Sequence, residues 1–148
     1  IIARASGGTR IEKIIGDFSD YLDYRKITVK YNQKESCLVK MNRDLAGILV
    51  MNLLKNAIIH NRQGGEIIIT LSSDNFTIEN TSDEPPVPQE KLFERFVRNP
   101  GNSSSTGLGL AIVKAITEVS YLSVTYSHNG MHRFNVRSLN NNQPDNNR

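Results

Sequence analysis

Three polar side chains spaced by four residues are the first candidates for chemistry. They are Asn52, Asn56 and His60, in the segment NLLKNAIIH. Residues four apart lie on one face of a helix, so we expect these side chains to line up while Leu53 and Ala57 point toward a core. Mg²⁺ bound with a triphosphate needs only one or two protein oxygens, because phosphate and water oxygens complete its octahedron. Asn56 is therefore a candidate metal ligand, and a solvated helix face is the alternative interpretation.

A glycine-rich segment, STGLGL at residues 105–110, is expected to open another helix. Unpaired N–H groups and the positive dipole end of a helix N-terminus attract phosphate oxygens, and glycines lack the Cβ atoms that would hold a ligand away. Glycine also serves as a plain linker, so this segment alone is a weak signal. It lacks the Gly-Lys-Ser/Thr ending of the Walker pattern, which excludes a P-loop here.

Hydrophobic periodicity predicts the elements that must position these segments. The predicted helices cover residues 9–22, 43–60, a short stretch through Leu92, Phe93 and Phe96, and a stretch that begins near Gly107. The predicted strands cover residues 27–31, 37–41, 66–71, 76–80, 122–126 and 134–139, with a turn at 32–35. Such an irregular alternation of helices and hairpins indicates an α+β fold: a two-layer α/β sandwich with helices on one face of a mixed sheet.

Two positions are expected to act as helix N-caps, Thr9 for the first helix and Asn42 for the helix at 43–60. Apolar residues at helical spacing define the side of the second helix that we expect to be buried. This stripe consists of Leu45, Ile48, Leu49, Leu53 and Ala57.

Length and composition indicate one soluble domain. The 148 residues suffice for a single core, and we expect residues 1–8 to be a linker, 9–139 the domain and 140–148 a disordered polar tail. A net charge of +3, from 18 basic and 15 acidic residues, gives no support for a nucleic-acid partner. The single Cys37 excludes an internal disulfide and fits the cytoplasm. The apolar stretches are shorter than the roughly 20 residues that a bilayer span needs.

The chain resembles the ATP-binding catalytic domain of sensor histidine kinases. These domains belong to the GHKL superfamily, whose members share the Bergerat ATP-binding fold with gyrase and mismatch-repair ATPases. NLLKNAIIH resembles the N box, LFERF at 92–96 the F box, and TGLGLAIVK at 106–114 the G2 box. The motifs follow the order of the family, and the resemblance covers roughly residues 9–139.

The resemblance implies roles for individual residues, with ATP and Mg²⁺ as the bound groups. Asn56 resembles the Mg²⁺ ligand, Asn52 its catalytic neighbour near the phosphates, and His60 the ring beside the nucleotide. A histidine that satisfies carbonyls at the helix end is the alternative for His60. Arg98 resembles a lid residue that reaches the terminal phosphate, with a solvated surface arginine as its alternative. The phosphate-binding segment comprises Thr106, Gly107, Leu108, Gly109 and Leu110.

The segment after the second hairpin strand departs from the family's Asp-x-Gly-x-Gly pattern, and reads Asn80-Thr-Ser-Asp-Glu-Pro-Pro. Asn80 can accept a hydrogen bond from the adenine amino group through its amide oxygen, but without the charge of a carboxylate. Asp83 is an alternative acceptor. Ile59 and Ser105 also replace a phosphate-binding lysine and a glycine of the family. These departures leave a degenerate pseudokinase or interaction module as the alternative function.

The residue one turn before the metal asparagine separates kinases from hydrolases in this superfamily. Hydrolases place a glutamate general base there, whereas this chain has Asn52, whose amide cannot take a proton. The resemblance therefore implies transfer of the γ-phosphoryl group to a histidine. No segment like the family's acceptor box precedes Thr9, so the acceptor is expected on a dimerisation domain of the same protein. The other expectations are a response-regulator partner, a monomeric isolated domain, a homodimeric full-length protein and a cytoplasmic position beneath an inner-membrane anchor.

Overall fold

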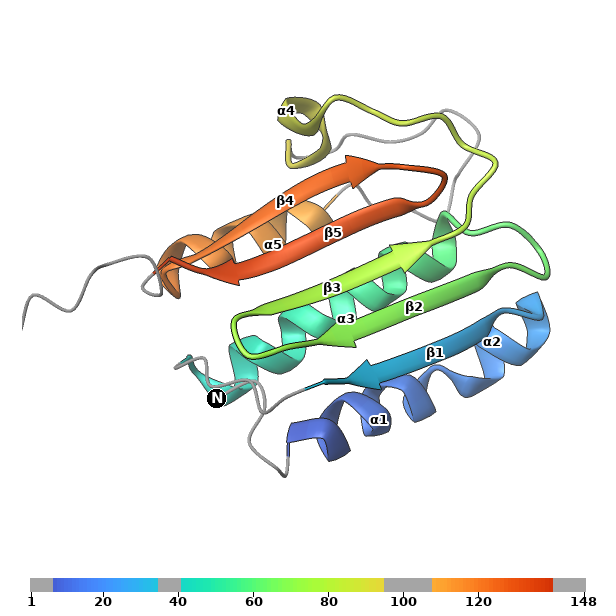
Figure 1. Ribbon diagram of the computed structural model, residues 1–148, viewed down its shortest axis with the longest axis horizontal. Coiled ribbons are helices and arrows are strands. Elements are labelled where there is room, and N and C mark those ends of the chain that lie inside the picture. The colour runs from blue at the N-terminus through green and yellow to red at the C-terminus, as the bar shows by residue number, and fades with distance from the viewer. Residues whose placement is uncertain (1–6, 35–40, 95–107, 140–148) are drawn as a thin grey trace, which may run out of the picture.

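The computed structural model describes residues 7–34, 41–94 and 108–139, and the described strands form one mixed sheet (Figure 1). The strands are β1 (Thr28–Gln33), β2 (Glu66–Leu71), β3 (Asn75–Asn80), β4 (Leu122–His128) and β5 (His132–Ser138). The helices are α1 (Gly7–Asp17), α2 (Ser19–Arg25), α3 (Arg43–Ile59), α4 (Gln89–Leu92) and α5 (Gly109–Val119).

The sheet has the strand order β1-β2-β3-β5-β4. The β1–β2 pair is parallel, and the other neighbours are antiparallel. The long helices α3 and α5 lie behind the sheet together with α1, so that one face carries the helical layer (Figure 1). This arrangement confirms the predicted α+β two-layer sandwich.

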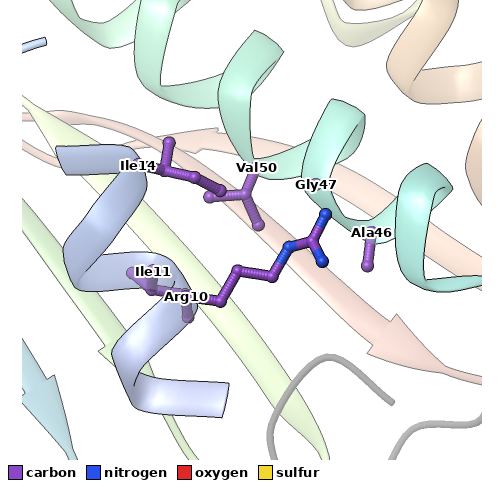
Figure 2. Close-up of a pocket in the computed structure, with 6 residues that line it drawn as sticks. All are labelled: Arg10, Ile11, Ile14, Ala46, Gly47 and Val50. Atoms are coloured by element: carbon purple, nitrogen blue, oxygen red, sulfur yellow. The ribbon is translucent and has the colours of Figure 1, made fainter. Parts of the chain in front are cut away.

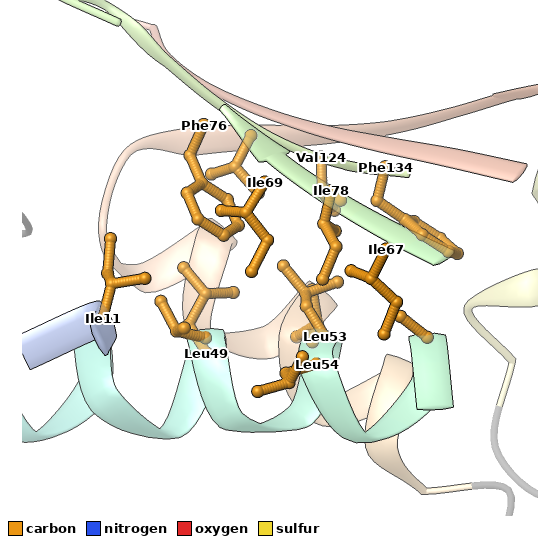
Figure 3. Close-up of a cluster of buried hydrophobic side chains, with 14 of the residues drawn as sticks. Ile11, Leu49, Leu53, Leu54, Ile67, Ile69, Phe76, Ile78, Val124 and Phe134 are labelled. Carbon is orange, nitrogen blue, oxygen red and sulfur yellow. The ribbon is translucent and has the colours of Figure 1, made fainter. Parts of the chain in front are cut away.

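The core fills the space between α3 and the sheet (Figure 3). Strand alternation points Ile67 and Ile69 of β2 toward the helices, where they meet Leu49 and Leu53 of α3. All four side chains are fully buried, and each such burial contributes about 1.5–3 kcal/mol. Because this contact fixes the rotation of α3 about its axis, it also fixes the direction of the polar residues on the helix flank.

Both ends of α3 are held by polar side chains. At the start, Oδ1 of Asn42 accepts hydrogen bonds from the backbone N–H groups of Asp44 at 2.9 Å and Leu45 at 3.1 Å, which confirms the predicted N-cap. At the other end, the guanidinium of Arg25 donates to the carbonyl oxygens of Ile58 at 3.0 Å and Asn61 at 2.5 Å. Helix α2 thereby anchors the end of α3 that carries the predicted histidine.

Helix α1 crosses α3 beside a small pocket, which is lined by Arg10, Ile11, Ile14, Ala46, Gly47 and Val50 (Figure 2). The guanidinium of Arg10 lies across Gly47, where an added Cβ atom would come within 2.4 Å of Nη2. This pocket contains none of the residues predicted for a nucleotide site. Within the described ranges, no helix is long and apolar enough to cross a membrane.

Four sequence expectations about the elements were wrong. Helix α1 begins at Gly7, so Thr9 lies inside it and is not its N-cap. The first predicted helix is divided at Phe18 into α1 and α2. Strand β1 continues through Gln33, where a turn was expected, because it pairs with β2 as far as Leu71. Ile48 is 37% exposed, since it faces away from the sheet. The strand predicted at 37–41 and the residues 1–6 and 140–148 fall outside the described residues, apart from Met41.

Candidate nucleotide-binding site

Asn80 is a buried polar residue at the end of a central strand. It continues the inward alternation of Phe76 and Ile78 on β3 and is only 2% exposed. Its Nδ2 donates a hydrogen bond to the carbonyl oxygen of Thr81 at 3.0 Å, so the amide oxygen is the group left to accept from a ligand. Asp83, the alternative acceptor, has a side chain 80% exposed and lies 3.8 Å from the Arg62 guanidinium. The buried acceptor of this loop is therefore Asn80.

Asn52 and Asn56 both lie on α3, one turn apart, with half-buried side chains. Nδ2 of Asn52 donates to the carbonyl oxygen of Ile48 at 2.8 Å. Its Oδ1 lies 3.4 Å from the position that a Cβ atom on Gly109 would take. The contact places the second half of α3 against the first residue of α5, so the N-box and G2-box segments meet in space.

The donor atoms on α3 suit a hard cation. Asn52 and Asn56 offer neutral amide oxygens, the ligand type that Mg²⁺ accepts when phosphate and water oxygens supply the remaining positions. Among the described residues, no group of three or more His, Cys, Asp or Glu side chains could hold a metal ion.

Helix α5 begins at the predicted phosphate-binding segment. Leu108 stands before its first turn, and the Leu108 carbonyl accepts a hydrogen bond from the N–H of Ile112 at 2.9 Å. The N–H groups of the first turn, including those of Gly109 and Leu110, have no acceptor within the helix. The Leu110 side chain is partly buried against the core and so anchors this turn.

Several predicted site residues lie outside the described residues. These are Arg98, Thr106 and Gly107, together with Ser105 and Phe96. Phe93, which precedes them, is partly buried and meets the Phe134 ring edge-on at 6.1 Å between centroids. Phe93 is therefore a core contact.

His60 stands at the C-cap position of α3, and its backbone N–H donates to the Asn56 carbonyl at 3.0 Å. Its ring does not satisfy helix carbonyls, which was one of the two interpretations from sequence. Nδ1 instead lies 2.8 Å from Oε2 of Glu84, in the loop that follows β3. The ring is half-buried, since 21% of the side chain is exposed.

A chain of hydrogen bonds continues from this loop to the last hairpin, and sequence reasoning missed it. The carbonyl oxygen of Glu84 lies 2.9 Å from Nε2 of His132, and Nδ1 of His132 lies 2.5 Å from the hydroxyl of Tyr126. Glu84 is 24 residues from His60 and 48 from His132, and no sequence pattern links positions at these separations.

Burial shifts the pKa values of His132 and Tyr126, the last two members of this series of hydrogen bonds. Burial lowers the pKa of His132, and the nearby His128 and His60 act in the same direction, while the Glu84 carbonyl and carboxylate oppose the shift. Burial also raises the pKa of Tyr126, against a hydrogen bond from the Val87 backbone. Both directions favour a neutral imidazole that accepts from a neutral phenol.

A second group of hydrogen bonds ties the end of α3 to the start of the same loop. The hydroxyl of Thr81 donates to Oδ1 of the buried Asn61 at 2.6 Å and accepts from the backbone N–H of Glu66 at 2.9 Å. Nδ2 of Asn61 donates to the Glu66 carbonyl at 3.1 Å. A Cβ atom on Gly65 would fall 2.1 Å from the Asn61 oxygen and 2.2 Å from the Thr81 oxygen, so only glycine fits beside this pair.

Residues 41–141 match the family model described as histidine kinase-, DNA gyrase B-, and HSP90-like ATPase. The chain belongs to this ATPase family. Sensor protein QseC of Escherichia coli K12 is 36% identical over 86 residues, which cover 57% of this chain and 19% of QseC. Heme sensor protein HssS of Staphylococcus epidermidis (strain ATCC 35984) is 32% identical over 116 residues, 76% of this chain and 26% of HssS. The chain thus spans about a fifth to a quarter of these relatives.

Solved structures of the ATPase family share the fold. The catalytic domain of histidine kinase ThkA matches with a TM-score of 0.76 and 23% identity, covering 87% of this chain and 89% of that domain. ThkA in complex with response regulator protein TrrA matches with a TM-score of 0.70 and 20% identity, and the match covers 92% of this chain and 41% of the ThkA chain. The cytoplasmic segment of histidine kinase QseC matches with a TM-score of 0.68 and 21% identity, covering 89% and 74%.

The comparisons confirm the resemblance to sensor histidine kinases found in the motifs. They also confirm the prediction of an ATP-binding domain of the type found in histidine kinases. Membership of this ATPase family implies that the chain binds ATP. The individual site residues stay predictions.

Proposed function

We propose that this domain binds ATP with Mg²⁺ and transfers the γ-phosphoryl group to a histidine on a dimerisation domain of the same protein. The contact between Asn52 and Gly109 carries the proposal. It brings an amide-lined helix flank against a helix N-terminus whose N–H groups suit phosphate oxygens. A triphosphate placed there would meet a hard-cation ligand on one side and dipolar donors on the other.

Asn80 is the residue that would recognise the base. Its amide oxygen would accept a hydrogen bond from an adenine amino group, since the residue is buried and Nδ2 is already bonded to the Thr81 carbonyl. A neutral acceptor forms a weaker bond than a carboxylate, so we expect binding weaker than that of an aspartate-containing relative. His60 would border the nucleotide from the end of α3.

Asn56 would hold the Mg²⁺, with Asn52 as its neighbour one turn earlier. When bound, the cation neutralises phosphate charge and orients the terminal phosphoryl group. The half-buried position of both amides on α3 supports this assignment, because each can reach a ligand without leaving the helix flank. Arg98 is proposed to reach the terminal phosphate.

Histidine phosphorylation is favoured over hydrolysis. Asn52 stands where a hydrolase needs a general base, and an amide cannot take a proton from water. In the proposed transfer, a nitrogen of the acceptor imidazole bonds to the γ-phosphorus in line, the bond to the bridging oxygen breaks, and ADP leaves with its electron pair. The domain contributes position and charge stabilisation, without a covalent intermediate of its own.

The remaining partners are proposed by similarity. The relatives are sensor proteins, and the ThkA structure contains a response regulator, so we propose a response regulator downstream of this protein. We also propose that the full-length protein is a homodimer with an inner-membrane anchor and that the isolated domain is a monomer. Its catalytic domain would lie in the cytoplasm, since the matching piece of QseC is a cytoplasmic segment.

The test is phosphorylation in trans. The 148-residue chain is incubated with γ-labelled ATP, Mg²⁺ and the separately purified dimerisation domain of the same full-length protein. We expect label on that domain that is stable to alkali and labile to acid, as a phosphohistidine is. A matched variant of the acceptor, with its histidine replaced by glutamine, should remain unlabelled. Absence of label on the unaltered acceptor, with nucleotide bound, would instead support a pseudokinase or interaction module.

A further inference from the structure

Glu84 links two histidines from different layers of the fold. Its carboxylate lies 2.8 Å from Nδ1 of His60, at the end of α3. Its backbone carbonyl lies 2.9 Å from Nε2 of His132, on β5. One residue of the loop after β3 is therefore held by the helical layer through its side chain and by the sheet through its main chain.

The contact with the Glu84 carboxylate determines which nitrogen of the His60 ring carries a proton. A carboxylate only accepts hydrogen bonds, so Nδ1 of His60 must carry the proton. In the neutral ring this leaves Nε2 without a proton, and in the charged ring Nε2 also becomes a donor. His60 follows Asn52 and Asn56 at a spacing of four, so the residue that Glu84 contacts stands at the end of the helix flank proposed for the nucleotide site.

The contact with the carbonyl fixes the loop beside the base-binding residue. His132 lies directly opposite Asn80 in the β3–β5 ladder, and its ring donates to Glu84 through Nε2 while Nδ1 accepts from the Tyr126 hydroxyl. The N–H of Glu84 also donates to Oγ of Ser82 at 3.0 Å. The segment from Asn80 to Glu84 is thus held at both ends, by strand pairing at Asn80 and by hydrogen bonds at Glu84.

We propose that Glu84 is a positioning residue of the nucleotide site. It holds the His60 imidazole with Nδ1 protonated and Nε2 turned to the nucleotide, and it keeps the loop closed beside Asn80. The inference rests on the proposed function, because it concerns the same ATP site. Glu84 acts through His60 and through the loop rather than by touching ATP.

Partial exposure sets the size of the expected effect. The side chains of His60 and Glu84 are 21% and 31% exposed, so solvent screens their attraction. The loss of the carboxylate should therefore weaken ATP binding by about fivefold to tenfold, in the range of one charged hydrogen bond, without abolishing it.

The ring state of His60 can be measured without any nucleotide. The chain has three histidines, so ¹⁵N-histidine labelling gives three pairs of ring signals, which single His→Gln variants assign. We expect His60 to carry its proton on Nδ1, and His132 to carry its proton on Nε2. In Glu84→Ala the His60 signals should shift toward the Nε2-protonated form that is usual in water. Glu84→Gln should restore the Nδ1 proton, because its amide oxygen still accepts.

The same variants then enter calorimetric titration with a non-hydrolysable ATP analogue. Glu84→Ala should lose about fivefold to tenfold in affinity, and Glu84→Gln should stay within about threefold of the unaltered chain. Asp83→Asn is the matched control, since it removes one negative charge from the neighbouring, exposed position. We expect Asp83→Asn to bind like the unaltered chain.

Two results would overturn the role of Glu84. One is a His60 tautomer that does not change in Glu84→Ala. The other is a changed tautomer with an affinity equal to that of Asp83→Asn. Failure of the proposed function looks different, because the unaltered chain would then bind no nucleotide although the NMR signals still reported the His60–Glu84 contact.

Discussion

The amide oxygen of Asn52 on α3 lies 3.4 Å from the place where a Cβ atom on Gly109 would stand at the start of α5. At this distance a single methyl group makes ordinary van der Waals contact, whereas a branched side chain would extend into the space beside the amide. The contact therefore predicts a difference between two substitutions of one glycine.

Gly109→Ala should keep both the fold and nucleotide binding close to those of the unaltered chain. Gly109→Val should weaken the affinity for an ATP analogue by about tenfold or more, equivalent to about 1.4 kcal/mol, because its methyl groups crowd Asn52 and the N–H groups of the first turn. Calorimetry measures the affinity, and urea unfolding controls for stability. Equal affinities for the two variants would show that this helix start does not border the ligand.

Gly65 is predicted to be the most sensitive glycine for folding. In Gly65→Ala the new Cβ atom would have to displace the hydrogen-bonded oxygens of Asn61 and Thr81, which lie 2.1 and 2.2 Å away. Breaking this buried contact should lower the free energy of unfolding by about 1–3 kcal/mol in a urea titration. Gly16→Ala is the control, because its added Cβ meets no atom within 4 Å beyond its own stretch of helix, and a helical alanine should stabilise by up to about 1 kcal/mol. Equal stabilities would contradict the tight contact.

The core contact of α3 gives a second stability prediction. Leu49→Ala should cost about 2–5 kcal/mol of unfolding free energy, because Leu49 is fully buried against the sheet. Met51→Ala, on the same helix but 43% exposed, should cost no more than about 1 kcal/mol. Chemical denaturation of both variants measures the difference. A Leu49 variant as stable as the Met51 variant would mean that α3 is rotated relative to this core.

The lowered pKa of His132 should make the stability of the fold depend on pH. Burial lowers its pKa in the folded state below the ordinary value near 6.5, so the unfolded chain binds the proton more tightly. The contribution of His132 is thus fully present above about pH 6.5 and is lost as the pH falls through the lowered pKa. Thermal unfolding between pH 8 and 5 should show a steeper loss of stability for the unaltered chain than for His132→Gln. Parallel curves would contradict the lowered pKa.

Periodicity was sufficient to predict the sandwich because β2 buries every second residue and the buried residues of α3 recur at spacings of three and four. The Asn42 cap follows from local chemistry, as does the turn between β4 and β5, where Gly130 has a φ of +74° that glycine adopts readily. Ile48 was placed wrongly because α3 is apolar on most of its circumference, which blurs the boundary of the buried stripe.

The candidate site was only partly predictable. Asn52, Asn56 and Gly109 came from motifs, and the structure places Asn52 beside Gly109. The link from His60 to His132 through Glu84 depends on tertiary contacts between segments 24 and 48 residues apart. No local propensity encodes such contacts, so no role for Glu84 could be predicted from the sequence.

The most direct test of the nucleotide site is calorimetric titration of the 148-residue chain with a non-hydrolysable ATP analogue, with and without Mg²⁺, beside Asn56→Ala. We predict micromolar binding that depends on Mg²⁺ and weakens by about tenfold or more in the variant, because the amide oxygen is the proposed metal ligand. Equal binding by both proteins would contradict the assignment of Asn56. No heat at millimolar ligand would contradict the nucleotide site itself.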